Sequence, residues 1–438
     1  MTRPRHTALV AGGLVALAAC TGGTTGTVTL DLITAPGSHV LDAVQQLRMT
    51  LTSPRQVVES SRTATGFELA LELDASGGNA ALIVEGLDAS GALVACGQSP
   101  VFPVTAINAS IVVYMAPPRS INAAAVALDA PRSEVSGTSL SYGVVLAGGR
   151  DAAGAPSAAI AIYNAYNQTL ISGIAMPGPR AGVALAAGTN GGVYLFGGVG
   201  ADDKPTGTLW RFDTTVAPNG AYATLPEQAG FARTGQLMVA VGTDRFLITG
   251  SPALTLAAGA LAARSDVASL PPVGAAVIAT SGTATAIFAD AQLLRFRGDA
   301  FDTLSGSSAG DATAAALPGG RIVVVGGGDP PSRDARVIDT TTGVVTVVAD
   351  ALATARSRPS VAATSRHLVV AGGTDAAGAP IASLEVLDAM TLAPIATLPI
   401  LARTGAFAAA LPNDQVMLVG GTPASPQIEL FTPEPPAL

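Results

Sequence analysis

Hydrophobic residues occur along this chain in short runs that alternate with polar residues or end at glycine. The clearest pattern is found twice, in residues 143–164 and 367–388. Each copy has an apolar run, Ala-Gly-Gly, one further residue, Asp-Ala-Ala-Gly-Ala-Pro, and a second apolar run that closes on Asn164 or Asp388. Short apolar runs bounded by glycine and turn residues are typical of β-strands. A pattern that recurs within one chain predicts an array of similar units.

The apolar run that ends in two glycines returns through the last three quarters of the chain. Clear copies lie at residues 144–149, 193–198, 323–328, 368–373 and 416–421. Degenerate copies lie at residues 246–251 and 285–290. Seven copies within residues 121–438 give a spacing of about 45 residues, near the period of propeller repeats. We therefore expect seven similar four-stranded units, or six if one degenerate copy does not form a unit.

Several copies continue with a strand that closes on an acidic residue and a threonine-containing turn, as in Phe-Asp-Thr-Thr after Arg211. A strand ending in Gly-Gly, a following strand with an aromatic tip and a turn beginning with Asp resemble the kelch-repeat family, which includes the central domain of galactose oxidase. This resemblance covers residues 121–438 and implies an all-β, kelch-like β-propeller. The aromatic markers of the family are sparse, since Trp210 is the only tryptophan.

The ends of the repeat region predict how the array is completed. Little sequence follows the strand-like residues 426–433 of the last copy, whereas residues 121–129 precede the first copy without a unit of their own. We predict that residues 121–129 pair as the outer strand of the last unit. We also expect the Gly-Gly strand to be second from the axis of each unit, with glycine allowing close backbone approach and positive φ where the chain leaves the strand.

Two charged series keep step with the repeat and define the candidate ligand site. Arginines lie about 16 or 17 residues before a glycine pair at Arg132, Arg180, Arg233, Arg356 and Arg403, while Gly274 and Asp311 occupy this place in the other copies. Aspartates follow the glycine pairs at Asp151, Asp202, Asp203, Asp329 and Asp375. We expect both series on one rim. Either each arginine binds carbonyls or an acidic group of the adjacent unit while aspartate suits the turns, or the rim recognises a glycan or a peptide.

Residues 28–117 have a different pattern, with short segments of period-two alternation separated by turns. Such alternation predicts antiparallel strands with one solvated face. We expect a small β-sandwich of immunoglobulin-like size in this range, acting as a spacer or, alternatively, binding carbohydrate. The chain lacks the Cys…Trp…Cys pattern of immunoglobulin domains, so only the architecture is predicted.

The N-terminus has the order of features of an export signal. A basic start is followed by an apolar stretch too short for a spanning helix, and then by Leu-Ala-Ala-Cys ending at Cys20. This order resembles the bacterial lipobox. The resemblance implies a signal peptide over residues 1–19, lipidation of Cys20 and a Gly/Thr tether over residues 20–27. Because Thr21 rather than Asp follows Cys20, we expect a protein anchored by lipid to the outer membrane, with its face unspecified.

The composition of the chain argues against several classes of partner and site. The net charge of −8 and the lack of clustered Lys and Arg argue against a nucleic-acid partner. Only His367 among the three histidines lies in the repeat region, which holds no cysteine, so we predict no metal site and no cofactor. Residues 306–310 match G-x-S-x-G without the strand and helix that a nucleophile elbow requires. No catalytic residue is predicted.

Three interpretations remain open at this point. One is a degraded propeller with a purely structural role, because two copies are degenerate, and the other two assign a function. The first function is a membrane-anchored binding or scaffold module for a protein or glycan partner. The second is an enzyme acting on sugars, an isomerase or a lyase, with Arg and Asp at the mouth of the propeller channel. The two differ in whether the arginines line a shared open pocket or are bonded within the fold.

Overall fold

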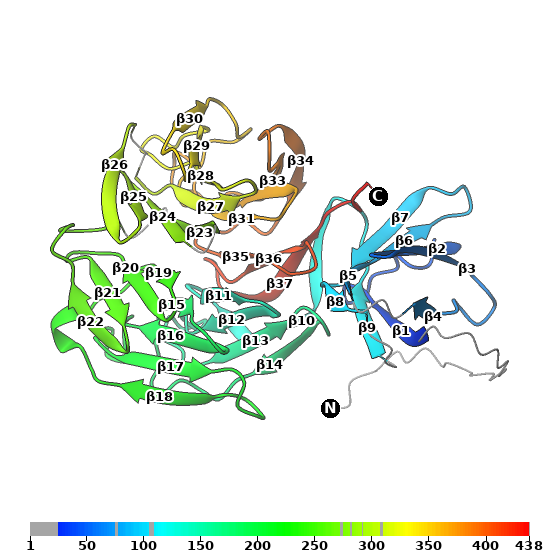
Figure 1. The fold of residues 1–438 in the computed structure, drawn as a ribbon, viewed down its shortest axis with the longest axis horizontal. Coiled ribbons are helices and arrows are strands. Elements are labelled where there is room, and N and C mark those ends of the chain that lie inside the picture. The colour runs from blue at the N-terminus through cyan, green and yellow to red at the C-terminus, as the bar shows by residue number, and fades with distance from the viewer. Residues whose placement is uncertain are drawn as a thin grey trace.

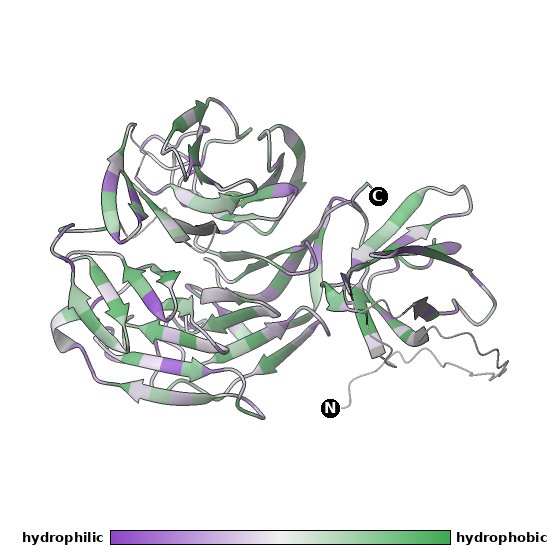
Figure 2. Ribbon diagram, viewed as in Figure 1, coloured by the Kyte–Doolittle hydropathy of each residue, from purple (hydrophilic) through white to green (hydrophobic). Residues whose placement is uncertain are grey.

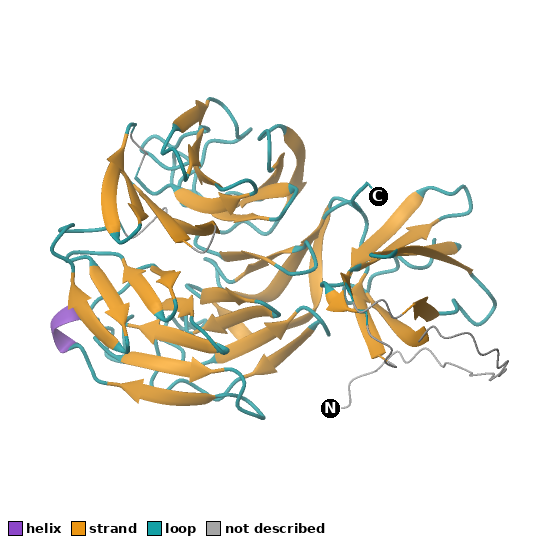
Figure 3. Cartoon of the chain, in the orientation of Figure 1, coloured by secondary structure: helices purple, strands orange, loops and turns teal. Residues whose placement is uncertain are grey.

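The computed structural model describes residues 25–74, 78–104, 109–271, 275–280, 283–290, 292–306 and 310–437. It contains two groups of β-sheets, a smaller one from the N-terminal quarter of the chain and a larger array from the rest (Figure 1). Almost every regular element described is a strand, apart from the single-turn helix η1 (Ala229–Phe231) (Figure 3). The predicted leader, Cys20, Gly274 and the serine of the G-x-S-x-G match lie outside the described residues.

The N-terminal group consists of two facing sheets and a short two-stranded ladder. The four-stranded sheet has the order β3-β2-β6-β7, formed by β2 (Gln46–Thr52), β3 (Arg55–Ser61), β6 (Leu82–Leu87) and β7 (Leu93–Gln98). The three-stranded sheet has the order β4-β1-β9, formed by β1 (Thr25–Ile33), β4 (Ala70–Asp74) and β9 (Ala109–Tyr114). The ladder pairs β5 (Asn79–Ala80) with β8 (Phe102–Pro103).

Alternating apolar side chains fill the space between these two sheets. Leu47, Met49 and Val84 from the four-stranded sheet share one buried cluster with Leu30 and Val113 from the other. Period-two alternation sends these residues to one face of each sheet, as the sequence pattern predicts. One pairing departs from a purely antiparallel arrangement, since β1 and β9 run parallel.

The larger array contains seven four-stranded antiparallel sheets, which we number in chain order. Sheet 1 comprises β11 (Ser136–Leu140), β12 (Gly143–Ala147), β13 (Ile160–Asn164) and β14 (Thr169–Ser172). Sheet 2 comprises β15 (Ala184–Ala187), β16 (Gly192–Phe196), β17 (Leu209–Asp213) and β18 (Ala221–Leu225). Sheet 3 comprises β19 (Met238–Gly242), β20 (Arg245–Ile248), β21 (Leu254–Ala257) and β22 (Ala260–Ala263).

The remaining sheets follow the same plan until the last. Sheet 4 comprises β23 (Ala275–Thr280), β24 (Thr283–Ala289), β25 (Leu293–Arg297) and β26 (Ala300–Leu304). Sheet 5 comprises β27 (Thr313–Leu317), β28 (Arg321–Val325), β29 (Ala335–Asp339) and β30 (Val345–Val348). Sheet 6 comprises β31 (Ser360–Ala363), β32 (His367–Ala371), β33 (Ser383–Asp388) and β34 (Pro394–Pro399). Sheet 7 comprises β35 (Phe407–Ala410), β36 (Val416–Val419), β37 (Ser425–Thr432) and β10 (Ser120–Arg132).

Sheet 7 joins the two ends of the repeat region. β10 pairs antiparallel with β37, so that Ile121 lies opposite Phe431 and Ala127 opposite Gln427. The prediction that residues 121–129 form the outer strand of the last unit is therefore confirmed. Both degenerate copies of the Gly-Gly strand, β20 and β24, also belong to four-stranded sheets.

The sheets form a propeller-like arrangement because each packs against the next. Their first strands make contact in series from β11 through β15, β19, β23, β27 and β31 to β35, and β35 also contacts β11. Each neighbouring pair of sheets shares a hydrophobic cluster, including sheets 7 and 1, where Met417 and Leu430 pack with Leu146. A four-stranded sheet that is apolar on both faces needs such neighbours, and hydrophobic residues run along most strands (Figure 2).

The strand that precedes each glycine pair is the second of its sheet, as predicted, and is buried on both faces. In sheet 1, all five residues of β12 are buried. The following Gly148 has φ of 61°, and a Cβ at this position would lie 2.2 Å from the carbonyl oxygen of Arg180. Glycine is required here because the backbone of the next connection passes too close for a side chain.

Candidate functional site

The arginine series lies where the chain enters the first strand of a sheet, at the edge where the Gly-Gly strands end. Arg356 Nη1 donates hydrogen bonds to the carbonyl oxygens of Gly372 (3.0 Å) and Ser383 (3.2 Å) of sheet 6. Arg132 repeats this contact in sheet 1, with bonds to the carbonyls of Gly148 (3.1 Å) and Ala159 (3.3 Å). The guanidinium groups therefore fasten an incoming connection to the turn that follows the second strand.

Two further arginines of the series also donate to backbone carbonyls. Arg233 Nη1 donates to the carbonyls of Thr249 (3.2 Å) and Pro252 (2.8 Å) in sheet 3. Arg403 Nη1 donates to the carbonyl of Gly420 (3.3 Å) in sheet 7. A charged donor to a buried carbonyl satisfies an acceptor that would otherwise be costly to bury.

Two buried glutamates, which the sequence analysis did not single out, complete the arginine contacts in sheets 6 and 7. Arg356 Nη2 bonds to the carboxylate of Glu385 on β33, and Arg403 Nη2 bonds to the carboxylate of Glu429 on β37. All four side chains are exposed by less than one tenth. Glu385 also accepts hydrogen bonds from the backbone N–H groups of Ala353 (2.6 Å) and Thr354 (3.0 Å).

The glutamates occupy one register position of the sheet, and this position differs from sheet to sheet. It lies on the third strand, opposite the residue two places before the first glycine or its equivalent. Sheets 1, 2 and 5 carry Ala161, Trp210 and Arg336 at this position. The Arg180 guanidinium stacks over the Trp210 ring at 4.6 Å from its centroid, so the aromatic face replaces the carboxylate in sheet 2.

In sheets 1 and 5, no carboxylate among the described residues pairs closely with the arginine at the equivalent place. Among the described residues, Arg132 pairs only with the largely exposed Asp129, at 3.9 Å, and its buried Nε has no hydrogen-bond partner. In sheet 5, Asp311 stands in the arginine place and Arg336 in the glutamate place. Arg336 Nη1 is nevertheless buried without a partner, and Asp311 pairs with Arg358 at 3.0 Å instead. Reversing the two charges therefore does not recreate the contact.

Burial opposes the charge of every arginine in the series. It lowers the pKa of all five guanidinium groups. In sheet 7 it also raises the pKa of the Glu429 carboxyl, while the attraction of Arg403 acts in the opposite direction. Desolvation disfavours a lone buried charge far more than a buried pair. The presence or absence of a carboxylate partner thus distinguishes otherwise equivalent arginines.

The aspartates predicted on the same rim are exposed turn residues. Asp151 accepts hydrogen bonds from the N–H groups of Ala153 and Ala155, both at 2.9 Å, and Asp375 binds its own loop in the same way. Asp203 accepts a bond from Arg150 at 2.8 Å. Asp329 is exposed. The contacts of Asp151 and Asp375 match the turn interpretation, whereas Asp203 pairs with an arginine of the neighbouring loop.

Arg180 and Asp202 are candidates that the fold brings near each other. A Cβ added to Gly200 would lie 3.5 Å from Arg180 Nη1 and 3.4 Å from Asp202 Oδ1. Apart from this approach, the contacts of each candidate arginine with the described residues lie within its own pair of neighbouring sheets. The contacts agree with the first interpretation, in which each arginine binds the adjacent unit, and recognition of a ligand by this rim stays a prediction.

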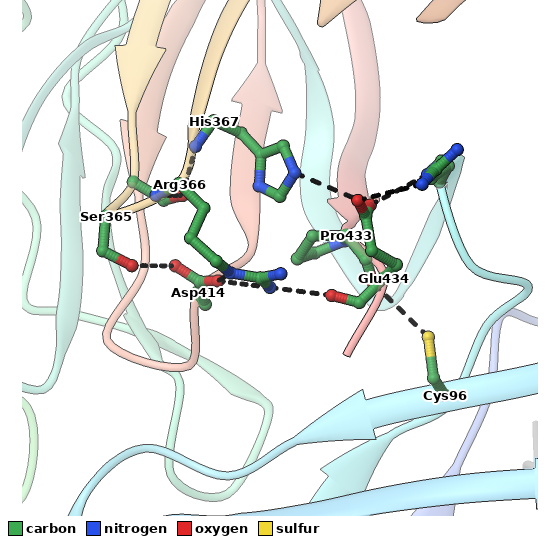
Figure 4. Close-up of polar contacts among 9 residues, drawn as sticks. Cys96, Ser365, Arg366, His367, Asp414, Pro433 and Glu434 are labelled. Carbon is green, nitrogen blue, oxygen red and sulfur yellow. Dashed lines mark hydrogen bonds and ion pairs between the residues drawn. The ribbon is translucent and has the colours of Figure 1, made fainter. Parts of the chain in front are cut away.

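A second polar cluster lies on the opposite rim, where the N-terminal sheets meet sheets 6 and 7 (Figure 4). The residues after β37 pass between the two groups of sheets. Arg366, in the β31–β32 hairpin, donates to Asp414 Oδ2 (2.9 Å) in the β35–β36 hairpin and to the Glu434 carbonyl (2.7 Å). The Glu434 carboxylate lies 3.1 Å from Arg119 Nε and 3.6 Å from His367 Nε2. The thiol of Cys96 donates to the Pro433 carbonyl at 3.3 Å.

Burial shifts the pKa values of three titratable groups in this cluster. It raises the pKa of the Cys96 thiol to about 12, so that the thiol stays protonated, in keeping with the prediction of a buried small side chain. Burial also lowers the pKa of His367, whose Nδ1 has no hydrogen-bond partner within the described part of the chain. For Glu434, burial raises the pKa, but the hydrogen bond from Arg119 and its other contacts outweigh it and leave the pKa lowered.

A groove of about 440 Å³ opens beside this cluster. Its lining combines the two hairpins of sheets 6 and 7 with Gln98 from β7 and Pro436 from the C-terminal segment. A smaller cavity of about 20 Å³ shares Gln98 and Arg366 in its wall. Its wall also contains Asn413, whose buried Oδ1 has no hydrogen-bond partner among the residues that the structure describes. No sequence motif pointed to this place, because it is assembled from three distant segments.

Within the described ranges, no three His, Cys, Asp or Glu side chains are arranged to hold a metal ion. Among the helices of the same residues, none combines the length and the apolar character needed to cross a membrane.

Comparisons with known proteins find matches among solved structures. No family model matches the sequence, and no curated protein matches it. The solved structure of YjhT superimposes with a TM-score of 0.45 at 14% sequence identity, covering 70% of this chain and 96% of that one.

Proposed function

We propose that this protein is an exported lipoprotein that displays a seven-bladed, kelch-like β-propeller as a binding or scaffold module. In this proposal, residues 1–19 are a signal peptide, Cys20 carries the lipid, residues 20–27 form a tether, residues 28–117 a β-sandwich, and residues 121–438 the propeller. The partner is a protein or a glycan. The site of display is the outer membrane.

The observation that carries the proposal is the way the array returns to its start. β10 precedes sheet 1 in the chain but pairs with β37 of sheet 7. Sheets 7 and 1 also share a hydrophobic cluster, and their first strands are in contact. Closing a ring in this way leaves only short, protected sheet edges and yields a rigid body with two rims. Such a body is suited to present loops to a partner.

The contacts of the arginine series favour binding or scaffolding over catalysis at that rim. An enzyme that used these arginines would need donors directed into a shared pocket. Arg132, Arg356 and Arg403 are instead almost fully buried and bonded to backbone carbonyls. We therefore rank the sugar isomerase or lyase below the binding module.

The direction of β1 supports a spacer role for the sandwich. β1 starts at Thr25, five positions after Cys20, and ends at Ile33, which packs against the cluster shared by sheets 1 and 7. Nine residues of extended strand span about 30 Å. A lipid on Cys20 would therefore hold the start of β1 near the membrane and the propeller about one strand length away from it.

Anchoring and binding are tested separately. Metabolic labelling with a fatty-acid analogue should mark the wild-type chain in the membrane fraction, and Cys20→Ser should abolish both the label and membrane retention. A labelled Cys20→Ser chain would contradict lipidation at this residue. Thermal unfolding of the full chain with a glycan panel, or with calcium, tests binding, since a ligand of the folded state adds RT ln(1 + [L]/Kd), about 2.7 kcal/mol at 100 Kd.

A further inference from the structure

We infer that the groove between the N-terminal sheets and the hairpins of sheets 6 and 7 binds a neutral, hydroxyl-rich ligand, a saccharide unit. The inference deepens the proposed binding function, on which it rests, by naming a site and a ligand class. The groove volume of about 440 Å³ lies within the range of about 300–1,000 Å³ that is typical of small-ligand sites.

The groove wall offers hydrogen-bonding groups that the fold leaves free. Arg366 bonds through Nε and Nη2, whereas its Nη1 has no partner among the described residues. The Gln98 amide likewise has no hydrogen-bond partner within the described part of the chain. The Ser365 hydroxyl lies in the same wall and contacts Asp414 at 3.3 Å. The Thr364 hydroxyl beside it accepts bonds from the N–H groups of Arg366 and His367, both at 3.2 Å, and keeps its own proton to donate. Donors and acceptors are thus present together, as a hydroxyl-rich ligand requires.

The charges of the wall favour a ligand without net charge. The Arg366 guanidinium is matched by the Asp414 carboxylate through two hydrogen bonds, at 3.2 and 2.9 Å. Behind them, the Glu434 carboxylate is held by Arg119 and lies beside His367. An anionic ligand would be repelled by the carboxylates of Asp414 and Glu434 beside Arg366, and a cationic ligand would be repelled by Arg366. The groove offers neither kind of ligand an unpaired charge of opposite sign.

Apolar surface completes the wall and sets the expected strength of binding. Leu411, Pro412, Pro436 and the alanines at the ends of β31 and β35 can contact the C–H faces of a sugar ring. The wall has no aromatic ring to stack on such a face, so the stacking contribution of an aromatic platform is absent. We expect binding in the millimolar range, strengthened when a polymer engages several copies on one surface.

The site depends on the junction between the two groups of sheets, because one wall belongs to each. Gln98 comes from β7, whereas Arg366 and Asp414 come from the hairpins of sheets 6 and 7. The bonds of Arg366 to the Glu434 carbonyl and of Cys96 to the Pro433 carbonyl hold the C-terminal segment between these walls (Figure 4). Binding and junction stability are therefore coupled.

The test is saturation-transfer NMR and titration of the full chain in a detergent without a sugar headgroup. The probes are glucose, galactose and N-acetylglucosamine, with glucuronate and glucosamine as charged counterparts. We expect at least one neutral sugar to bind about tenfold or more tightly than its charged counterpart. Ser365→Trp, which fills the groove from an exposed position, should abolish binding. Gln98→Ala, which removes one hydrogen-bonding group, should weaken it about 3- to 10-fold.

Thr243→Trp is the matched control, because Thr243 is an exposed residue of the equivalent hairpin in sheet 3, away from the groove. It should leave binding unchanged. Thermal unfolding verifies that each variant folds. If Ser365→Trp does not fold, the sugar affinity of Gln98→Ala decides whether the inference holds. Failure of every neutral sugar to bind, binding that survives both groove variants, or equal binding of glucuronate would each overturn the inference. Fatty-acid labelling of Cys20 is independent of all these outcomes.

Discussion

Sheets 6 and 7 and sheets 1 and 2 each accommodate a buried arginine, but with different partner residues. In all four, an arginine enters from the preceding connection and its guanidinium is buried. Arg356 and Arg403 meet a glutamate on the third strand, at the register position where Arg180 meets the Trp210 ring. In sheet 1, which Arg132 enters, Ala161 occupies this position. Only the carbonyl contacts of Arg132, Arg356 and Arg403 are shared. Arg180 instead bonds to the Thr208 hydroxyl and to the carbonyl of Pro179. The comparison teaches that the bond to the glycine carbonyl recurs in three of the four sheets, and that the partner compensating the charge varies.

The largest effect is expected from breaking a carboxylate pair. Arg356→Ala leaves Glu385 buried and uncompensated, so we expect a loss of about 3–5 kcal/mol in the free energy of unfolding. Chemical denaturation measures this loss. The paired variant Arg356→Met with Glu385→Leu should lose much less, because it removes both charges and keeps the volume. Equal losses in the single and paired variants would contradict the role assigned to the pair.

Replacing the arginine that stacks on tryptophan should cost less. Arg180→Met keeps the packing of the alkyl chain but removes the cation–π contact at 4.6 Å and the bonds to Thr208. A partly buried contact of this kind contributes about 1–2 kcal/mol. Denaturation followed by the fluorescence of Trp210, the only tryptophan, reports the change. A loss as large as that of Arg356→Ala would show that the aromatic partner is equivalent to a carboxylate.

Supplying the missing partner in sheet 1 should stabilise the protein. Ala161→Glu places a carboxylate at the register position of Glu385, in the sheet that Arg132 enters. We expect a gain of about 1 kcal/mol, since a lone buried charge becomes a buried pair. Ala161→Gln, of equal size and without charge, serves as the control. If the two variants have the same stability, the shape of the side chain rather than its charge governs this position.

The smallest effect concerns His367, a buried basic group of sheet 6 with an unpartnered Nδ1 and with Arg366, Asp414 and Glu434 as charged neighbours. Burial lowers its pKa from 6.5 in the folded state. Below pH 6.5, His367 therefore binds a proton in the unfolded chain but not in the folded chain. The free energy of unfolding falls as the pH decreases below 6.5. His367→Gln should flatten the stability profile between pH 6.5 and the lowered pKa. An unchanged profile would assign this pH dependence to other groups.

Much of the array follows from the printed sequence because its signals are local and repeated. The glycine pairs and the Asp turns each meet a backbone requirement that one residue type satisfies. The outer-strand role of residues 121–129 follows from their place before the first copy. Asp388, for example, accepts hydrogen bonds from Met390 and Thr391 in the predicted turn. The arginine periodicity was equally visible, and its carbonyl contacts match one of the two interpretations.

The partners of the arginines were harder to foresee. Glu385 and Glu429 lie three residues before the ends of their strands, a signal visible only once the third strands are aligned by their register. The groove could not be predicted from local patterns, because Gln98, Arg366 and Asp414 are brought together by the docking of the N-terminal sheets on sheets 6 and 7. No repeat or spacing encodes that contact.

The central claim is that the arginines of the repeat hold the fold together internally and do not recognise the ligand. Arg403→Met tests it most directly when the free energy of unfolding and the binding of a neutral sugar are measured on the same sample. The account predicts a stability loss of several kcal/mol, since Glu429 loses its partner, with sugar affinity unchanged wherever the variant is folded. Unchanged stability together with lost binding would contradict it.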